Sequence, residues 1–268
     1  MDPIRYRIDG DDLQLVEIEL DAGHSAVAEP GAMMYMDHGL VIDTVLGEGS
    51  GRGNALVRLW RGLKRSFTGE SLFSSVFTNP DGAARRVAFA APYPGKIVPI
   101  DLQSVGGMLI CQKGAFLCAA RGVEVGVALQ KRLRVGFFGG EGFIMQKLEG
   151  DGTAFIHASG MLSEIRLQPG EKLRVDTGCL AALQPSVRYD IQYAGRMKTA
   201  LFGGEGVFFA SLQGPGTVWL QSLPIKRLAA RIIVDGIRQR SRGWGARIYL
   251  VLVILFLLLM LAGGEPPT

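Results

Sequence analysis

Three glutamates occupy the same place in repeated stretches of the chain, and their carboxylates could act together. Glu141 and Glu205 each stand in the sequence Phe-Gly-Gly-Glu-Gly, and Glu70 stands in the related Phe-Thr-Gly-Glu-Ser. If the repeats meet around a common axis, three equivalent carboxylates would suit a hard cation. The alternative is that each glutamate pairs with a nearby base or caps a turn, which is the commoner use. Both interpretations stay open: a ligand site at the repeat interface, and isolated structural carboxylates.

The cysteines and histidines show no metal-binding or nucleophilic arrangement. Cys111, Cys118 and Cys179 have no Cys-x-x-Cys spacing and no histidine at zinc-finger distance. The three histidines share no motif, and no nucleophile elbow is present. We therefore predict core thiols in a reducing compartment, no metal, no cofactor and no enzymatic activity.

The glycine-rich stretch at 47–54, GEGSGRGN, resembles a dinucleotide-binding loop only superficially. No βαβ unit follows it, and the Lys-Ser/Thr pair of a phosphate loop is absent. A hinge is the better interpretation, so no nucleotide is expected.

The composition favours strands over helices in the body that carries these residues. Apolar residues make up 48% of the 268 positions and charged residues 20%, with 37 glycines. This balance indicates many short strands and tight turns. We predict an all-β body with an ample core.

The body contains internal repeats. Residues 138–156 and 202–220 are identical at nine of nineteen positions, and a weaker third copy begins at Phe67. We predict one three-repeat β domain at 1–222, with copies at about 1–100, 101–165 and 166–222. Because a β unit with an unpaired edge tends to bury it against a neighbour, three copies predict a pseudo-threefold body.

A run of methionines in the first copy allows two interpretations. Met33, Met34 and Met36 could line a pocket, or they could fill the core. Core filling is the commoner use of methionine and is favoured here.

Positive charge is concentrated just before the C-terminal tail. The segment 223–247 contains seven basic residues against Asp235, while residues 1–222 carry a net charge of −1. A nearly neutral body lacks the broad basic face that nucleic-acid binding needs. We therefore expect no nucleic-acid partner, and the basic segment needs another explanation.

A basic amphipathic helix is predicted at 223–242, next to a membrane. Ile225, Leu228, Ile232 and Ile237 recur near one stripe at helical spacing. This helix could lie on anionic lipid or dock on the body, and the two alternatives are equally supported. The basic residues predicted to face lipid are Lys226, Arg227, Arg231, Arg238, Arg240 and Arg242.

The stretch at 243–264 is predicted to be a C-terminal transmembrane anchor, with a short tail at 265–268. No charged residue interrupts 248–264, which as a helix would span roughly 25 Å. A buried core helix is the alternative, but almost no position is polar on any face. The residues proposed for the anchor are Arg247, Ile248, Tyr249, Leu250, Leu255, Phe256 and Leu261.

The repeated Phe-Gly-Gly-Glu-Gly segments, the turns at 29–33 and 184–185, and the strand Thr217–Leu220 carry a resemblance. Over about residues 1–224 the chain resembles the altered-inheritance-of-mitochondria family of bacterial and mitochondrial proteins. That family is related in fold to the tryptophan RNA-binding attenuator protein. The first copy departs from the pattern, with Thr68 and Ser71 in place of glycines.

The resemblance implies three jelly-roll-like β units and a tendency to oligomerise. For the mitochondrial members it implies association with inner-membrane organisation, and it brings no catalytic residues. The ligand residues of the attenuator protein cannot be matched position by position here, so RNA binding is not implied.

These observations lead to two functional hypotheses. The first is a non-enzymatic, membrane-anchored oligomeric scaffold that presents a β platform to cytoplasmic protein partners. It would be a single-pass protein of the inner (cytoplasmic) membrane, with its body on the cytoplasmic side, in contact with lipid and other copies of itself. The alternative is a ligand- or cation-responsive sensor that binds at the repeat interfaces.

Overall fold

The computed structural model describes residues 4–46, 73–120, 122–131, 143–193, 208–225 and 228–229. The chain divides into two compact units, Met1–Pro224 and Ile225–Thr268. Within the described ranges, no helix is both long enough and apolar enough to cross a bilayer. The predicted anchor at 243–264 and most of the predicted helix at 223–242 lie outside the described residues.

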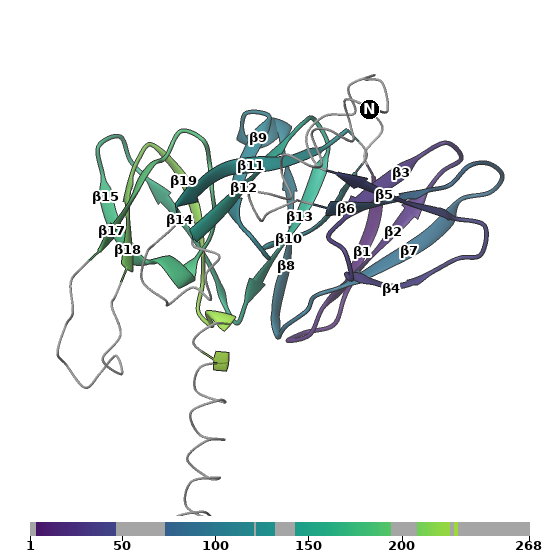
Figure 1. Cartoon of the computed structure of the whole chain (residues 1–268), viewed down its shortest axis with the longest axis horizontal. Helices are drawn as coiled ribbons and strands as arrows, with labels where there is room; N and C mark the ends of the chain where they lie inside the picture. The colour runs from purple at the N-terminus through teal and green to yellow at the C-terminus, as the bar shows by residue number, and fades with distance from the viewer. Residues whose placement is uncertain are drawn as a thin grey trace, which may run out of the picture. The chain divides into compact units, whose positions relative to one another are not determined.

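The first unit is built from β-strands, so the prediction of an all-β body is confirmed (Figure 1). The strands of its first part are β1 (Arg5–Asp9), β2 (Leu15–Leu20), β3 (Ser25–Ala28), β4 (Met33–Met36), β5 (Val41–Leu46), β6 (Phe73–Thr78) and β7 (Arg85–Ala90). The next are β8 (Gly95–Asp101), β9 (Met108–Gln112), β10 (Phe116–Ala120), β11 (Glu124–Lys131), β12 (Phe143–Glu149) and β13 (Thr153–Ser159). The last are β14 (Leu162–Leu167), β15 (Lys172–Asp176), β16 (Leu180–Leu183), β17 (Arg188–Tyr193), β18 (Phe208–Gln213) and β19 (Gly216–Gln221). Two 3-10 turns, η1 (Gln103–Val105) and η3 (Thr177–Cys179), stand between strands.

Alternating side chains explain why these segments form strands. In β2 the apolar residues Val16, Ile18 and Leu20 are buried, while Glu17 and Glu19 between them point to the other face. A period of two residues places one set on each side of a sheet. β2 therefore buries one face and keeps its charges on the other.

Strand pairing follows the same order three times. We call β2–β7 the first repeat, β8–β13 the second and β14–β19 the third, and we number the six strands of each repeat in chain order. In every repeat, the first, sixth and third strands pair in that order in one group, and the fourth, fifth and second strands pair in that order in another. β1 stands outside this pattern and extends the first group of the first repeat by pairing with β2.

Neighbouring repeats share sheets. The second strand of one repeat pairs with the third strand of the next, as Ala28 with Cys118 and Cys111 with Ala182 show. These two junctions, β3–β10 and β9–β16, each join two three-stranded groups into a six-stranded sheet. The repeats are thus connected by continuous hydrogen-bonded sheets.

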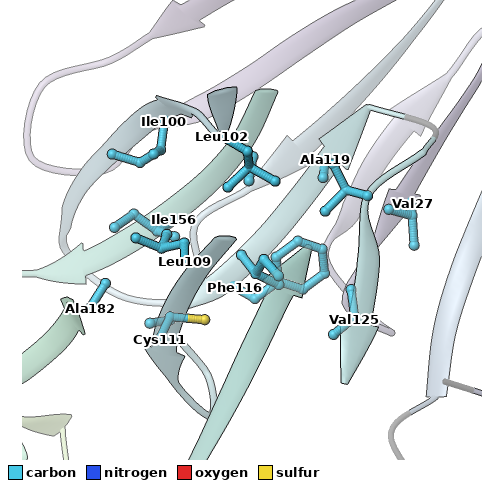
Figure 2. Packing of buried hydrophobic residues seen from close by; sticks show 14 of the residues in the cluster. Val27, Ile100, Leu102, Leu109, Cys111, Phe116, Ala119, Val125, Ile156 and Ala182 are labelled. Carbon is cyan, nitrogen blue, oxygen red and sulfur yellow. The ribbon is translucent and has the colours of Figure 1, made fainter. Parts of the chain in front are cut away.

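The junction strands β3, β10 and β16 are buried on both faces. On β10, Phe116 and Ala119 belong to the core of the second repeat, whereas Leu117 and Cys118 belong to the core of the first. Figure 2 shows Phe116 and Ala119 in the second-repeat core, with Val27 from the preceding repeat. A third core is built mainly from the third repeat, with Phe143 and Met145 of β12 contributed by the second. Side chains of a shared strand therefore serve two cores.

The turn between the fifth and sixth strands explains two of the repeated glycines. A Cβ on Gly150 would lie 2.4 Å from the Gly122 carbonyl oxygen, and one on Gly214 would lie 2.4 Å from the Gln168 carbonyl oxygen. Because a side chain would collide with backbone, only glycine fits without movement. The first repeat has buried Asn79 instead, whose side-chain nitrogen donates to the Leu20 carbonyl at 2.9 Å.

Candidate functional site

The ligand site predicted from the sequence lies outside the described residues. Glu70, Glu141 and Glu205 all fall there. In the described part of the chain, no group of three or more His, Cys, Asp or Glu side chains is placed to hold a metal ion. Also outside are the predicted lipid-facing and anchor residues Lys226, Arg227, Arg231, Arg238, Arg240, Arg242, Arg247, Ile248, Tyr249, Leu250, Leu255, Phe256 and Leu261.

The cysteines that sequence analysis assigned to the core are largely there. Cys111 and Cys118 are free thiols with no solvent exposure, and burial raises the pKa of both. Cys179 is partly buried. A buried thiol with a raised pKa is a poor nucleophile, so Cys111 and Cys118 serve packing.

The second repeat contains a buried histidine that could act as a titratable group. His157 is 2% exposed, and its Nε2 has no hydrogen-bond partner among the described atoms. Burial lowers the pKa of His157, and a backbone hydrogen bond at Tyr93 opposes that shift. The ring is therefore neutral near pH 7, and the Tyr93 ring lies beside it with the two centroids 6.3 Å apart. His157 belongs to no described group of three or more potential metal ligands.

Exposed apolar side chains concentrate on β4 and β5 of the first repeat. Among the described residues, six of the eleven exposed large hydrophobic side chains belong to these two strands. They are Met33, Met34 and Tyr35 on β4, and Val41, Ile42 and Val45 on β5. Several apolar side chains exposed on one strand, as on β4, are typical of interaction sites. We call Met33, Met34 and Tyr35 the β4 edge.

The β4 edge also has unpaired backbone groups. β4 pairs with β7 on one side, and no described strand pairs with its other side. The Asp37 N–H donates to the Arg86 carbonyl at 2.8 Å, so the Asp37 polar groups face β7. Because backbone groups alternate in direction along a strand, those of Met36 face the open side. An open edge of this kind is a template for another strand.

The matching strands of the other repeats show what normally covers this position. Tyr35, Cys118 and Ala182 are equivalent, since each pairs with the sixth strand of its own repeat just after a register shift. Tyr35 is 39% exposed, whereas Cys118 and Ala182 are fully buried. Cys118 and Ala182 pack into the core of the preceding repeat. No described strand takes the place of a preceding repeat beside β4, and Tyr35 is left uncovered.

The neighbouring residue shows the same contrast more strongly. Met34 is 59% exposed, while its counterparts Leu117 and Ala181 are 1% and 0% exposed. The sequence-based interpretation that Met33 and Met34 fill the core is therefore wrong, whereas Met36 does pack against the first-repeat core. The β4 edge carries large apolar groups at a place where the other repeats are buried.

Charged groups hold the β4 edge in position on its sheet. The Tyr35 hydroxyl donates to Glu17 Oε2, and Arg86 Nε lies 3.3 Å from Asp37 Oδ2. The hydrogen bond to Glu17 raises the pKa of Tyr35, while the Arg86 backbone N–H and guanidinium lower the pKa of Asp37. Arg7 also pairs with Glu17, at 3.6 Å. Tyr35 is thus a fixed, protonated donor at neutral pH.

A signal for the β4 edge is present in the sequence. Aligning Met33–Met36 with Phe116–Ala119 and Leu180–Leu183 places Tyr35 where the other copies have the smaller Cys118 and Ala182. A large side chain at a position that is small in both sister copies indicates a different environment. The short apolar run alone did not reveal this.

Comparison with known proteins places the chain among relatives that are themselves uncharacterised. A family model described as "Mitochondrial biogenesis AIM24" matches residues 6–223. An uncharacterised protein of Streptococcus pyogenes serotype M6 is 28% identical over 232 residues, covering 85% of this chain and 90% of the relative. An X-ray structure of a Streptococcus pyogenes protein superposes with a TM-score of 0.67 at 24% identity, covering 87% of this chain and 99% of that one. The likeness to this solved structure shows the fold.

Proposed function

The chain belongs to the mitochondrial biogenesis AIM24 family, and from that premise we propose that it is a non-enzymatic, membrane-anchored scaffold. In this proposal an oligomeric β platform presents surfaces to cytoplasmic protein partners. The observation that carries it is the β4 edge, where Met34 is 59% exposed although its counterparts in the sister repeats are buried. A β body with an uncovered apolar strand is suited to binding other proteins.

The proposed membrane placement is supported by the sequence of the tail. The uncharged stretch 248–264 follows a segment of high positive charge at 223–247. Basic residues beside an apolar span favour the cytoplasmic side. We therefore propose an inner-membrane protein with a single span, with its β body on the cytoplasmic side.

The finer architecture belongs to the same proposal. Three jelly-roll-like units related by a pseudo-threefold axis stay a prediction, together with the two C-terminal helices. The threefold recurrence of strand pairing supports the repeat part of this prediction. The sensor alternative depends on Glu70, Glu141 and Glu205, and no described contact favours it.

The test of membrane placement is carbonate extraction of the full chain beside a version that ends at Arg242. We expect the full chain to stay in the membrane pellet and the shortened version to be released, because the uncharged stretch is the proposed anchor. Release of both versions would contradict the anchor and place the scaffold away from the bilayer. Retention of both would show that the basic segment or a membrane partner is sufficient, and would contradict the tail as the necessary anchor.

A further inference from the structure

The third repeat also has an edge strand, β15, whose sister strands in the other repeats are paired on both sides. β15 pairs with β18, and no described strand pairs with its other side. β15 is the second strand of its repeat, and its counterparts β3 and β9 each pair with the third strand of the following repeat. Among the described strands, the third strand of the first repeat, β4, and the second strand of the third repeat, β15, therefore both lack the partner that their sister strands have.

Side-chain exposure agrees with this account at the β15 end. Leu173 is only partly buried against the third-repeat core, whereas its counterparts Ala26 and Leu109 have no exposure. These three residues are equivalent because each lies two positions before the junction residue, which is Ala28 in β3 and Cys111 in β9. The β4 edge thus exposes side chains that the internal junctions bury, and the β15 end leaves Leu173 partly uncovered.

The internal junctions also fix a register for pairing the two ends. Ala28 lies opposite Cys118, and Cys111 lies opposite Ala182. The corresponding residue of β15 is Val175, and that of β4 is Tyr35. A third junction built in the same way pairs Tyr35 with Val175.

One step along the strands, the same register gives a second pair. Val27 lies opposite Ala119, and Ile110 lies opposite Leu183. Their counterparts are Arg174 on β15 and Met36 on β4, and the backbone groups of Met36 face the open side. The Met36–Arg174 pair is therefore the hydrogen-bonded one, and Tyr35–Val175 is the closer, non-hydrogen-bonded pair.

We propose that the β4 edge of one copy pairs antiparallel with β15 of a second copy, Tyr35 opposite Val175, and repeats between chains the junction that joins repeats within one chain. The inference rests on the proposed oligomeric scaffold and names how its copies join. No sheet of the described body contains both β4 and β15, so the pairing joins two chains. The contact is head-to-tail and leaves a free end on each copy, which generates rings or filaments.

Charge on β15 disfavours a simpler pairing of identical strands. Lys172 and Arg174 are exposed on β15. Two antiparallel β15 strands paired about their midpoint would place Arg174 opposite Arg174, and like charges directly opposite each other destabilise the pairing. β4 carries no charge between Met33 and Met36, so β15 meets apolar side chains there. Tyr35 against Val175 is an aromatic and β-branched pair of the kind that stabilises sheets.

The test is disulfide cross-linking of the full chain in detergent micelles. We would make Tyr35→Cys with Val175→Cys, because opposite non-hydrogen-bonded residues have Cα atoms about 4.5 Å apart, within disulfide range. Oxidation with diamide should give a ladder of covalent multimers on a non-reducing gel, reversed by reductant. Each single variant controls for the native thiols, and Leu13→Cys with Val175→Cys is the mismatched pair, since Leu13 is 66% exposed and lies off β4.

Three outcomes would overturn the inference. A cross-linked monomer would show closure within one chain, and a dimer from Tyr35→Cys alone would show β4 pairing with β4. The third is a failure of both the Tyr35–Val175 pair and the Met36→Cys/Arg174→Cys pair to give multimers while circular dichroism shows a folded body. Carbonate extraction reads membrane placement separately, so a failed cross-link leaves that part of the proposed function standing.

Discussion

β10 and β4 are the same strand of the repeat in two different surroundings. Both pair with the sixth strand of their repeat, and both shift register at the same place. β10 also pairs with β3 of the preceding repeat, and its Leu117 and Cys118 are buried. β4 has no such neighbour among the described strands, and its Met34 is 59% exposed. The difference shows that burial in this fold depends on the adjacent repeat more than on the strand itself.

The largest expected effect on stability comes from placing a charge on β10, the buried strand of the two. Leu117→Asp should lower the free energy of unfolding by more than about 4 kcal/mol, because it leaves an unpaired carboxylate in an apolar core. Met34→Asp, the matched change on β4, should cost the isolated chain about 1 kcal/mol or less, since the new carboxylate can reach water. Urea unfolding of the full chain in micelles, followed by circular dichroism, measures both. Equal costs would show that the two strands share one environment.

The next effect concerns the aromatic side chain that one repeat inserts into the preceding one. Phe155 on β13 lies in the first-repeat core, with its ring 4.8 Å from that of Tyr6, and Ala88 holds the matching place in β7. Phe155→Ala should cost about 3–4 kcal/mol in unfolding free energy through lost burial and the cavity left behind. Phe155→Leu is the control and should retain most of the stability. A cost below about 1 kcal/mol for the alanine variant would contradict a core shared between repeats.

A smaller effect is expected at the turn where the first repeat differs from its sisters. The Asn79 side chain donates to the Leu20 and Ala83 carbonyls and accepts from Arg85 Nη1 at 2.6 Å. Asn79→Ala should cost about 2–3 kcal/mol, because buried partners lose their hydrogen bonds. Asn79→Asp keeps the acceptor for Arg85, and its unfolding free energy should lie between those of the wild type and Asn79→Ala in the same measurement. No change in either variant would show that the turn does not depend on this side chain.

The smallest expected effect is a pH dependence of folding stability, which arises in the second repeat and has no counterpart in the first. His157 is buried with a lowered pKa, and Ala90 holds the matching place in β7. The unfolded chain binds a proton at His157 more readily than the folded chain, so stability should fall as pH drops through about 6.5. The urea midpoint of His157→Gln should change less between about pH 7.5 and 5.5 than that of the wild type. Parallel pH curves would exclude His157 as the cause.

The sequence predicted the fold class because local signals agree with the final structure. The matching stretches 138–156 and 202–220 form equivalent pairs of strands, β12 and β13 in one copy and β18 and β19 in the next. The shared Gly150 and Gly214 stand where another backbone passes close by. The proposed carboxylate site could not be checked in the same way, because Glu70, Glu141 and Glu205 lie outside the described residues.

The β4 edge was missed for a physical reason. Met33 and Met34 are apolar, and an apolar run has the same pattern whether a neighbouring repeat covers it or not. Exposure here is decided by the strand beside β4, because no described strand pairs with its open side, whereas β10 and β16 each pair with the preceding repeat. Comparing the three copies residue by residue, with Tyr35 against Cys118 and Ala182, provides the missing information.

The most direct test of the account is the mass of the full chain in detergent micelles by multi-angle light scattering. If the β4 edge is an uncovered junction, the protein mass of the wild type should be at least twice the chain mass of 28.9 kDa. Met34→Asp should be monomeric with an unchanged circular dichroism spectrum. A wild type that stays monomeric at every concentration, or a Met34→Asp variant with the same mass as the wild type, would contradict the account.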